Sequence, residues 1–170
     1  MRLREHVRSG LALRLVLCAC VLGLLLWVAN DGPISSAIQG AFARIVGGIL
    51  NVFGEGALVT GNTVQTQLFG ISVVTACTGL FLTGLFAAAV ILFPARWRAK
   101  WIGLGLGIGG IFLLNVVRLV TLYYIGVHWP AVLDTVHRLV WQSLLIAFAV
   151  VLWLIWAGVW GRAPRREVAT

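Results

Sequence analysis

Charged side chains are scarce in this chain of 170 residues. Only 11% of the residues are Asp, Glu, Lys or Arg, whereas 61% are hydrophobic, and the mean hydropathy is +1.01. A soluble domain of this size cannot bury so much apolar surface, so the composition excludes a soluble globular protein and predicts an integral membrane protein. The length suits one compact helical domain over residues 1–170 better than two domains.

Acidic residues and cysteines are also few, with five Asp and Glu and three Cys. Cys18 and Cys20 lie within an apolar run, where we expect inert packing residues, so the sequence offers no disulfide framework and no metal-ligand spacing. We therefore expect no metal and no other cofactor. The net charge of +8 is carried by short basic clusters at the ends of apolar runs, which is typical of topology signals and leaves no basic face for a nucleic acid.

Four apolar runs are candidates for membrane-spanning helices, at about residues 11–29, 78–93, 101–125 and 139–160. The first run is alternatively a signal peptide, because a basic start and an apolar core precede the small residues 35–37. We interpret it as an uncleaved helix, since the run is long and strongly apolar. The third run contains glycines four positions apart, a spacing that permits close helix packing. The sequence thus predicts an all-α four-helix transmembrane bundle.

The segment 30–77 between the first two runs has a different character. Its first part predicts an amphipathic helix over 34–53, because apolar residues recur every three to four positions. These residues are Ile34, Ile38, Phe42, Ile45, Ile49 and Val52, with Ser35, Gln39, Arg44 and Asn51 opposite. We interpret this helix as lying in the membrane interface, because an arginine near mid-bilayer costs about 2.5–3.5 kcal/mol, although some polytopic proteins carry such helices across.

Short β-like pieces follow. Leu58–Thr60 and Thr63–Gln67, joined by a turn at Gly61-Asn62, predict a small hairpin or extended loop. Residues 71–74 then lead in extended form to Cys77. This polar stretch needs water or protein around it, so we expect it outside the hydrocarbon.

The basic clusters predict the topology. They fall at residues 2–14, 96–100 and 162–166, and the intervening loops carry Asp31, Glu55 and Asp134 with only Arg44 and Arg138 against them. The positive-inside rule therefore places both termini in the cytoplasm and the segment 30–77 on the outer side of the membrane.

This topology brings three chemically complementary residues to the outer face from three helices. Cys77 opens the second span, where unpaired N–H groups and the helix dipole favour a thiolate. Arg118 lies about 25 Å from the inner end of the third span at ~1.5 Å per residue, and His137 opens the fourth. Taken singly, Cys77 is equally a small structural residue, and Arg118 equally a side chain that snorkels to the headgroups.

Together the three residues suit acyl transfer. His137 can take the proton of the Cys77 thiol and return one to the leaving amine, while Arg118 can stabilise the thiolate or an oxyanion. Asp134 either caps the helix or orients the imidazole. His128 is a competing base, but it lies in a loop of tryptophan and proline.

Three short motifs carry a family resemblance: Cys77-Thr78-Gly79-Leu80, then Asn115-Val116-Val117-Arg118-Leu119, then His137. They resemble the exosortase/archaeosortase family of membrane cysteine transpeptidases. The resemblance implies that Cys77 is the nucleophile, that Arg118 and His137 assist it, and that Asn115 is a possible orienting residue.

The resemblance also implies a substrate. Such enzymes cleave a C-terminal sorting tail, made of a short motif, a transmembrane helix and a basic end, from proteins exported across the bacterial inner membrane. We expect the substrate helix to pack beside the glycine-rich third span, and the partners to be tail-bearing proteins and membrane lipid. The sequence leaves open transpeptidation or hydrolysis. Two rivals are a non-catalytic scaffold for polysaccharide or protein export and a small transporter or channel subunit.

Overall fold

The computed structural model describes residues 16, 19, 20, 23 and 32–160, so the expected first span at 11–29 lies largely outside the described residues. The described elements are, in chain order, α2 (Pro33–Val52), β1 (Leu58–Thr60), β2 (Thr63–Gln65), β3 (Gly70–Ser72), a 3₁₀ turn η1 (Thr75–Cys77), α3 (Leu80–Leu92), α4 (Trp97–His128), a 3₁₀ turn η2 (Pro130–Val132), α5 (Leu133–Thr135), a π-helical turn η3 (Val136–Trp141) and α6 (Gln142–Val159).

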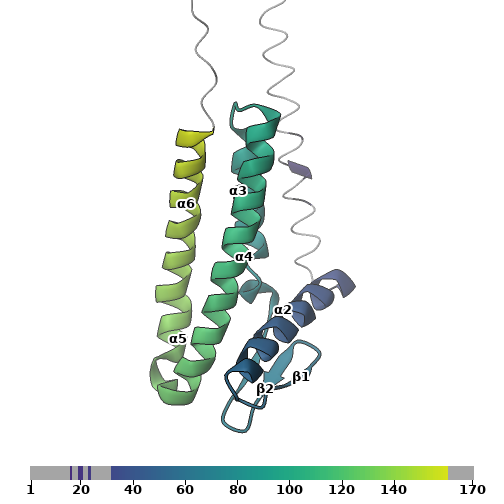
Figure 1. The fold of residues 1–170 in the computed structure, drawn as a ribbon, viewed down its shortest axis with the longest axis vertical. Helices are drawn as coiled ribbons and strands as arrows, with labels where there is room; N and C mark the ends of the chain where they lie inside the picture. Colours follow the sequence, from purple (N-terminus) through teal and green to yellow (C-terminus); the bar gives the residue numbers. More distant parts are fainter. Residues whose placement is uncertain (1–15, 17–18, 21–22, 24–31, 161–170) are drawn as a thin grey trace, which may run out of the picture.

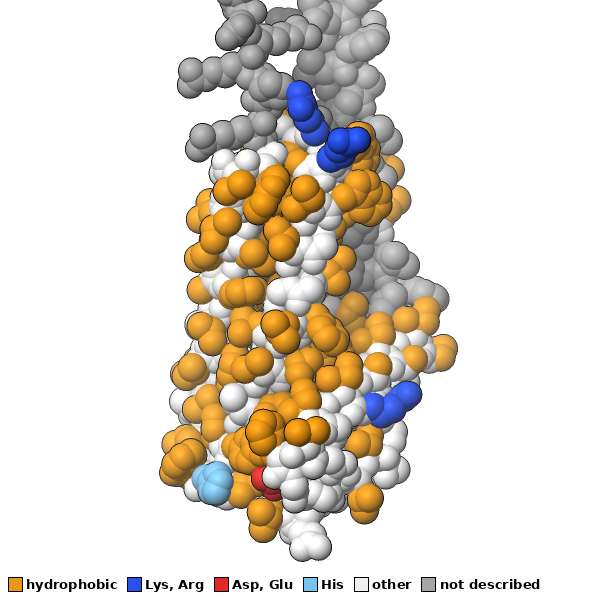
Figure 2. All heavy atoms as spheres, in the orientation of Figure 1, with side chains coloured by type: hydrophobic (Ala, Val, Ile, Leu, Met, Phe, Trp, Pro, Cys, Tyr) orange, Lys and Arg blue, Asp and Glu red, His pale blue; other side chains and the backbone are white. Residues whose placement is uncertain are grey.

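The chain is a mostly helical membrane protein. Among the described residues, the helices at Pro33–Val52, Trp97–His128 and Pro130–Val159 are long and apolar enough to cross a bilayer, and α3 is a shorter apolar helix. Helices α3, α4 and α6 run side by side, while α2 crosses them obliquely at one end, next to the strands (Figure 1). On the face shown in Figure 2, basic side chains cluster at one end, and an apolar band separates them from a histidine and an acidic side chain near the other.

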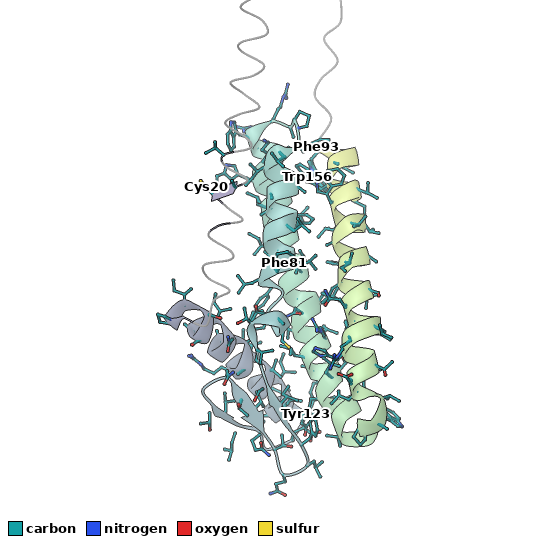
Figure 3. All side chains as sticks on the ribbon, turned by 180° about the vertical axis from the view of Figure 1, so that it is seen from behind. Cys20, Phe81, Phe93, Tyr123 and Trp156 are labelled. Atoms are coloured by element: carbon teal, nitrogen blue, oxygen red, sulfur yellow. The ribbon has the colours of Figure 1, made fainter. Side chains whose placement is uncertain are left out.

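Glycines on α4 let the neighbouring helices approach closely. A methyl group added at Gly103 would lie 2.5 Å from the indole nitrogen of Trp156, and one added at Gly107 would lie 2.0 Å from the ring of Phe86. The Trp156 indole donates a hydrogen bond to the carbonyl of Ala99 at 2.7 Å and packs edge-on against Phe93. Figure 3 shows Phe93 and Trp156 together at the end of the bundle opposite Tyr123. The predicted close packing at this helix therefore occurs within the chain itself.

At the other end, α2 and a three-stranded antiparallel sheet of order β1-β2-β3 form a cap on α4. The sequence predicted two strand-like pieces joined at Gly61-Asn62, and the structure adds a third strand that pairs Val64 with Ile71. Tyr123 of α4 joins the cap to the helix. Its side chain is fully buried, and its hydroxyl donates a hydrogen bond to Glu55 at 2.9 Å and is hydrogen-bonded to the Thr66 hydroxyl at 2.9 Å.

The buried face of α2 differs from the one that its apolar periodicity suggests. The side chains packed inward include Ser35, Gln39, Phe42, Val46 and Leu50. Ile34, Ile45 and Val52, assigned to the apolar face, are exposed. The physical reason is that a helix of a membrane protein can turn apolar side chains outward, whereas its polar side chains need partners inside the protein.

Gly107→Ala is expected to lower the free energy of unfolding by about 1–3 kcal/mol, because the new methyl group would overlap the buried Phe86 ring. Gly105→Ala is the matched control on the same helix, since a methyl group there meets nothing within 4 Å. The higher helix propensity of alanine would raise the free energy of unfolding of Gly105→Ala by up to about 1 kcal/mol. The measurement is the thermal unfolding midpoint in detergent micelles; equal midpoints for the two variants would contradict this packing.

Candidate functional site

Cys77 lies at the end of a tight turn that the motif Cys77-Thr78-Gly79 builds. The Cys77 N–H donates to the Val74 carbonyl at 2.7 Å, and the Thr78 hydroxyl donates to the Thr75 carbonyl at 2.7 Å. Gly79 has φ +68°, a left-handed conformation that favours glycine. Because α3 begins only at Leu80, Cys77 precedes the helix by three residues. The expectation that Cys77 opens the helix was therefore wrong by one turn.

Asn115 holds this turn from α4. Its side chain is fully buried, and its amide nitrogen donates a hydrogen bond to the Cys77 carbonyl. Its carbonyl oxygen has no hydrogen-bond partner. The structure therefore places Asn115 on the backbone of Cys77, which suits a positioning residue.

A polar network fixes the same turn from the cap. The Gln39 amide donates to the Ser35 hydroxyl and to the Thr75 hydroxyl, each at 2.9 Å. Asn62 donates to Gln39 at 3.1 Å and to the Val73 carbonyl at 2.9 Å. Sequence reasoning missed this network, although Ser35 and Gln39 stand one helical turn apart. Their spacing was interpreted as an outer polar face.

Arg118 and His137 meet beside Cys77. A terminal nitrogen of Arg118 lies 3.3 Å from Nε2 of His137, and the guanidinium also interacts electrostatically with Cys77. Arg118 is only 3% exposed, and its Nε has no partner. Since a guanidinium can only donate, Nε2 of His137 accepts and carries the lone pair in this arrangement. His137 lies in the π-helical turn η3, a local distortion that is frequent at functional sites.

A cavity of about 300 Å³ joins the cysteine to the histidine. Cys77 and His137 both line it, together with part of β3, and Leu119 and Leu122 contribute apolar wall. Asp134 lies at the same cavity, but its carboxylate accepts a hydrogen bond from Arg138 at 2.6 Å, and α5, in which it is the second residue, has no side-chain cap.

Two further expectations concerned Asp134 and His128. Neither alternative predicted for Asp134, a helix cap or a hydrogen bond to His137, is present among the described residues. His128 is exposed at the end of α4 and lies against the ring of Trp129, with ring centroids 5.7 Å apart. It lines neither of the cavities described here.

A second, apolar groove of about 490 Å³ lies between α3 and α6. Its lining begins at the cysteine turn with Thr75, Ala76 and Gly79, includes Arg118, and continues along both helices to Trp153. The indole nitrogen of Trp153 is buried without a hydrogen-bond partner. Arg118 therefore borders this groove while it contacts His137 of the first cavity.

A family profile described as transmembrane exosortase matches residues 7–157. The chain belongs to the transmembrane exosortase family. The match extends over the cap, the cysteine turn and the helices that carry Arg118 and His137. No curated protein and no solved structure is significantly similar to the chain. Membership of the exosortase family points to a membrane transpeptidase-like role and to cysteine peptidase chemistry.

Asn115→Ala is expected to raise the rate at which N-ethylmaleimide alkylates Cys77 by about fivefold or more, because losing this buried hydrogen bond releases a turn in which Cys77 is only 5% exposed. Asn51→Ala is the matched control, since the Asn51 amide also holds backbone groups, those of Ala57, but makes no hydrogen bond to the cysteine turn. Both variants are made with Cys18 and Cys20 replaced by alanine. Equal acceleration in both would indicate a general loss of stability instead.

Proposed function

We propose that this exosortase is a membrane cysteine transpeptidase or protease in which Cys77 is the nucleophile, His137 the general acid and base, and Arg118 the electrostatic stabiliser. The observation that carries the proposal is the meeting of these groups from three separate segments. Cys77 and His137 line one cavity, and Arg118 contacts His137 and interacts with Cys77.

The contacts suggest an order of events. The Cys77 thiol proton passes to the lone pair on Nε2 of His137, and the Arg118 guanidinium then faces a thiolate in place of that lone pair. The sulfur attacks the scissile carbonyl, and the oxyanion of the tetrahedral intermediate takes up the negative charge beside Arg118. His137 gives its proton to the leaving amine as the C–N bond breaks, which leaves a thioester on Cys77.

Charge and helix length support a site at the outer boundary of the bacterial inner membrane. Helix α3 has 13 residues, which span about 20 Å at ~1.5 Å per residue, less than the ~30 Å of hydrocarbon. If the basic first turn of α4, with Arg96, Arg98 and Lys100, marks the cytoplasmic surface, Cys77 lies beneath the outer headgroups, where little water weakens the charge of Arg118. Both termini are cytoplasmic in this arrangement.

The groove between α3 and α6 supports a substrate with a membrane helix. It is lined by apolar side chains along its length and reaches Thr75 and Ala76 of the cysteine turn. A helix in this groove would place the residues just before it at Cys77, as a sorting tail of motif, transmembrane helix and basic end requires. Gly103 and Gly107 of α4 are less suitable for this helix than the sequence suggested, because the side chains of Trp156 and Phe86 already cover them.

A non-catalytic scaffold for polysaccharide or protein export is the second candidate. It accounts for the apolar helices but gives no reason to bury Arg118 beside a histidine and a cysteine. The two functions differ in the reactivity of Cys77. A nucleophile reacts with a thiol-directed probe faster than a free cysteine at neutral pH, whereas a structural thiol at 5% exposure reacts slowly.

Cys77→Ala, His137→Ala and Arg118→Ala are each expected to lower cleavage of a labelled tail-bearing substrate by at least about 10³-fold, because each removes one member of a group that acts together. The substrate is a host exported protein that carries the motif, helix and basic tail. His128→Ala is the matched control and should cleave normally. Normal processing by Cys77→Ala would exclude covalent catalysis, and an inactive His128→Ala with an active His137→Ala would make His128 the base.

Leu85→Trp and Ile146→Trp are each expected to lower cleavage about tenfold, because the larger side chains fill the groove between α3 and α6. Alkylation of Cys77 by a small reagent should stay unchanged. Leu113→Trp is the control, since Leu113 is 65% exposed on α4 and lies outside the groove. If Leu113→Trp were the inactive variant, the substrate helix would lie on α4, as the sequence first suggested.

A further inference from the structure

Strand β3 is an edge strand. The order of the sheet is β1-β2-β3, so β3 pairs only with β2. An edge strand presents unpaired backbone N–H and C=O groups, which can pair with a further extended chain. The pairing register with β2 determines which backbone groups of β3 are unpaired.

The register shows which residues point outward. The Thr66 N–H donates to the Phe69 carbonyl, and the Val73 N–H donates to the Asn62 carbonyl, while Val64 pairs with Ile71 between them. In an antiparallel ladder hydrogen-bonded pairs alternate with non-hydrogen-bonded pairs. Gly70 and Ser72 therefore belong to the non-hydrogen-bonded pairs with Gln65 and Thr63, and their N–H and C=O groups point away from β2.

This free edge lies at the catalytic cavity. Gly70, Ile71 and Ser72 line the same cavity of about 300 Å³ as Cys77 and His137. Backbone donors and acceptors in an extended conformation thus lie along one wall, and the proposed nucleophile and base lie along another.

We propose that the substrate main chain binds in extended form by adding a strand to the free edge of β3, at Gly70 and Ser72, which holds the scissile carbonyl beside Cys77. The biological role of this contact rests on the proposed function above. The recognised ligand is an extended peptide backbone, bound by main-chain hydrogen bonds.

The walls of the cavity agree with this binding mode. Side chains of an added strand alternate in direction, so one set would face the apolar side chains of Leu119, Leu122 and Leu133 across the cavity. Strand addition gives affinity through the backbone and selectivity through the pockets of alternate side chains. A substrate helix in the groove between α3 and α6 would follow on the other side of the cysteine turn.

The test uses the full chain in detergent with Cys18 and Cys20 replaced by alanine and with Cys77 retained. The probe is the symmetrical disulfide of the peptide acetyl-Ala-Cys-Ala-Ala-amide. The Cys77 thiolate attacks this disulfide, forms a mixed disulfide and releases one peptide thiol, with no net oxidation. The equilibrium constant of exchange is compared with that of cystamine, which has no peptide main chain.

Ser72→Pro removes the outward N–H and is tolerated in an edge strand, whereas Ser72→Ala keeps the N–H and loses only the hydroxyl contact with Thr63. For the protein with unaltered β3 and for Ser72→Ala, the equilibrium constant of exchange should be about tenfold larger with the peptide than with cystamine. The reason is that main-chain hydrogen bonds stabilise the mixed disulfide with the peptide. Ser72→Pro should lose this preference. An N-methylated peptide, tested against the protein with unaltered β3, should also show no preference over cystamine.

Two results would overturn the proposal: no preference for the peptide in the unaltered strand, or a preference that survives both Ser72→Pro and N-methylation. The exchange needs no catalysis. If the peptide preference holds while tail-bearing substrates stay uncut, the edge of β3 binds peptide and the proposed function is wrong. If substrates are cut without any peptide preference, the proposed function stands and the strand addition is wrong.

Discussion

The structure depends on one buried guanidinium. Arg118 lies 3% exposed on a membrane helix, and the ion pair found among the described residues, between Arg138 and Asp134, does not involve it. Its hydrogen-bond partner is an imidazole at 3.3 Å, and Cys77 lies within range for electrostatic interaction. A buried cation without an anionic partner is costly. In the proposed mechanism, the negative charge of a thiolate or an oxyanion offsets this cost. The Nε of the same side chain has no hydrogen-bond partner, so it is a free donor for such an anion.

The cysteine turn is the second constraint, because it must hold a sulfur beside Arg118 where no helix supports it. Two unrelated parts of the chain provide the support. Asn115 binds the Cys77 carbonyl from α4, and Gln39 binds the Thr75 hydroxyl from the cap. The site is thus fixed both by α4 and by the cap, which explains why α2 turns Ser35 and Gln39 inward while Ile45 is exposed. In lipid an exposed isoleucine costs nothing, but an unbonded amide does.

The sequence was sufficient to predict a mostly helical membrane protein and its family, because apolar runs and short motifs are visible directly in the sequence; the roles of the three candidate site residues and their place on the outer face stay predictions. Other features have no local signal. The π-helical turn that presents His137 is one of them. The glycines of α4 were recognised as packing positions. The side chains that fill them, Phe86 of α3 and Trp156 of α6, have no sequence signal that pairs them with particular glycines, so the position of the free groove could not be predicted.

The two cavities meet at the cysteine turn. Thr75 and Gly79 border the groove between α3 and α6, whereas Cys77, between them in sequence, borders the cavity beside β3. Gly79 makes this possible, because its left-handed φ of +68° bends the chain between the sulfur and the first turn of α3. A straight helix from Thr78 would have placed Cys77 and the groove along one line. The bend therefore separates the apolar groove between α3 and α6 from the cavity that Cys77 and β3 line, which is the arrangement that the proposed substrate, a membrane helix preceded by an extended chain, requires.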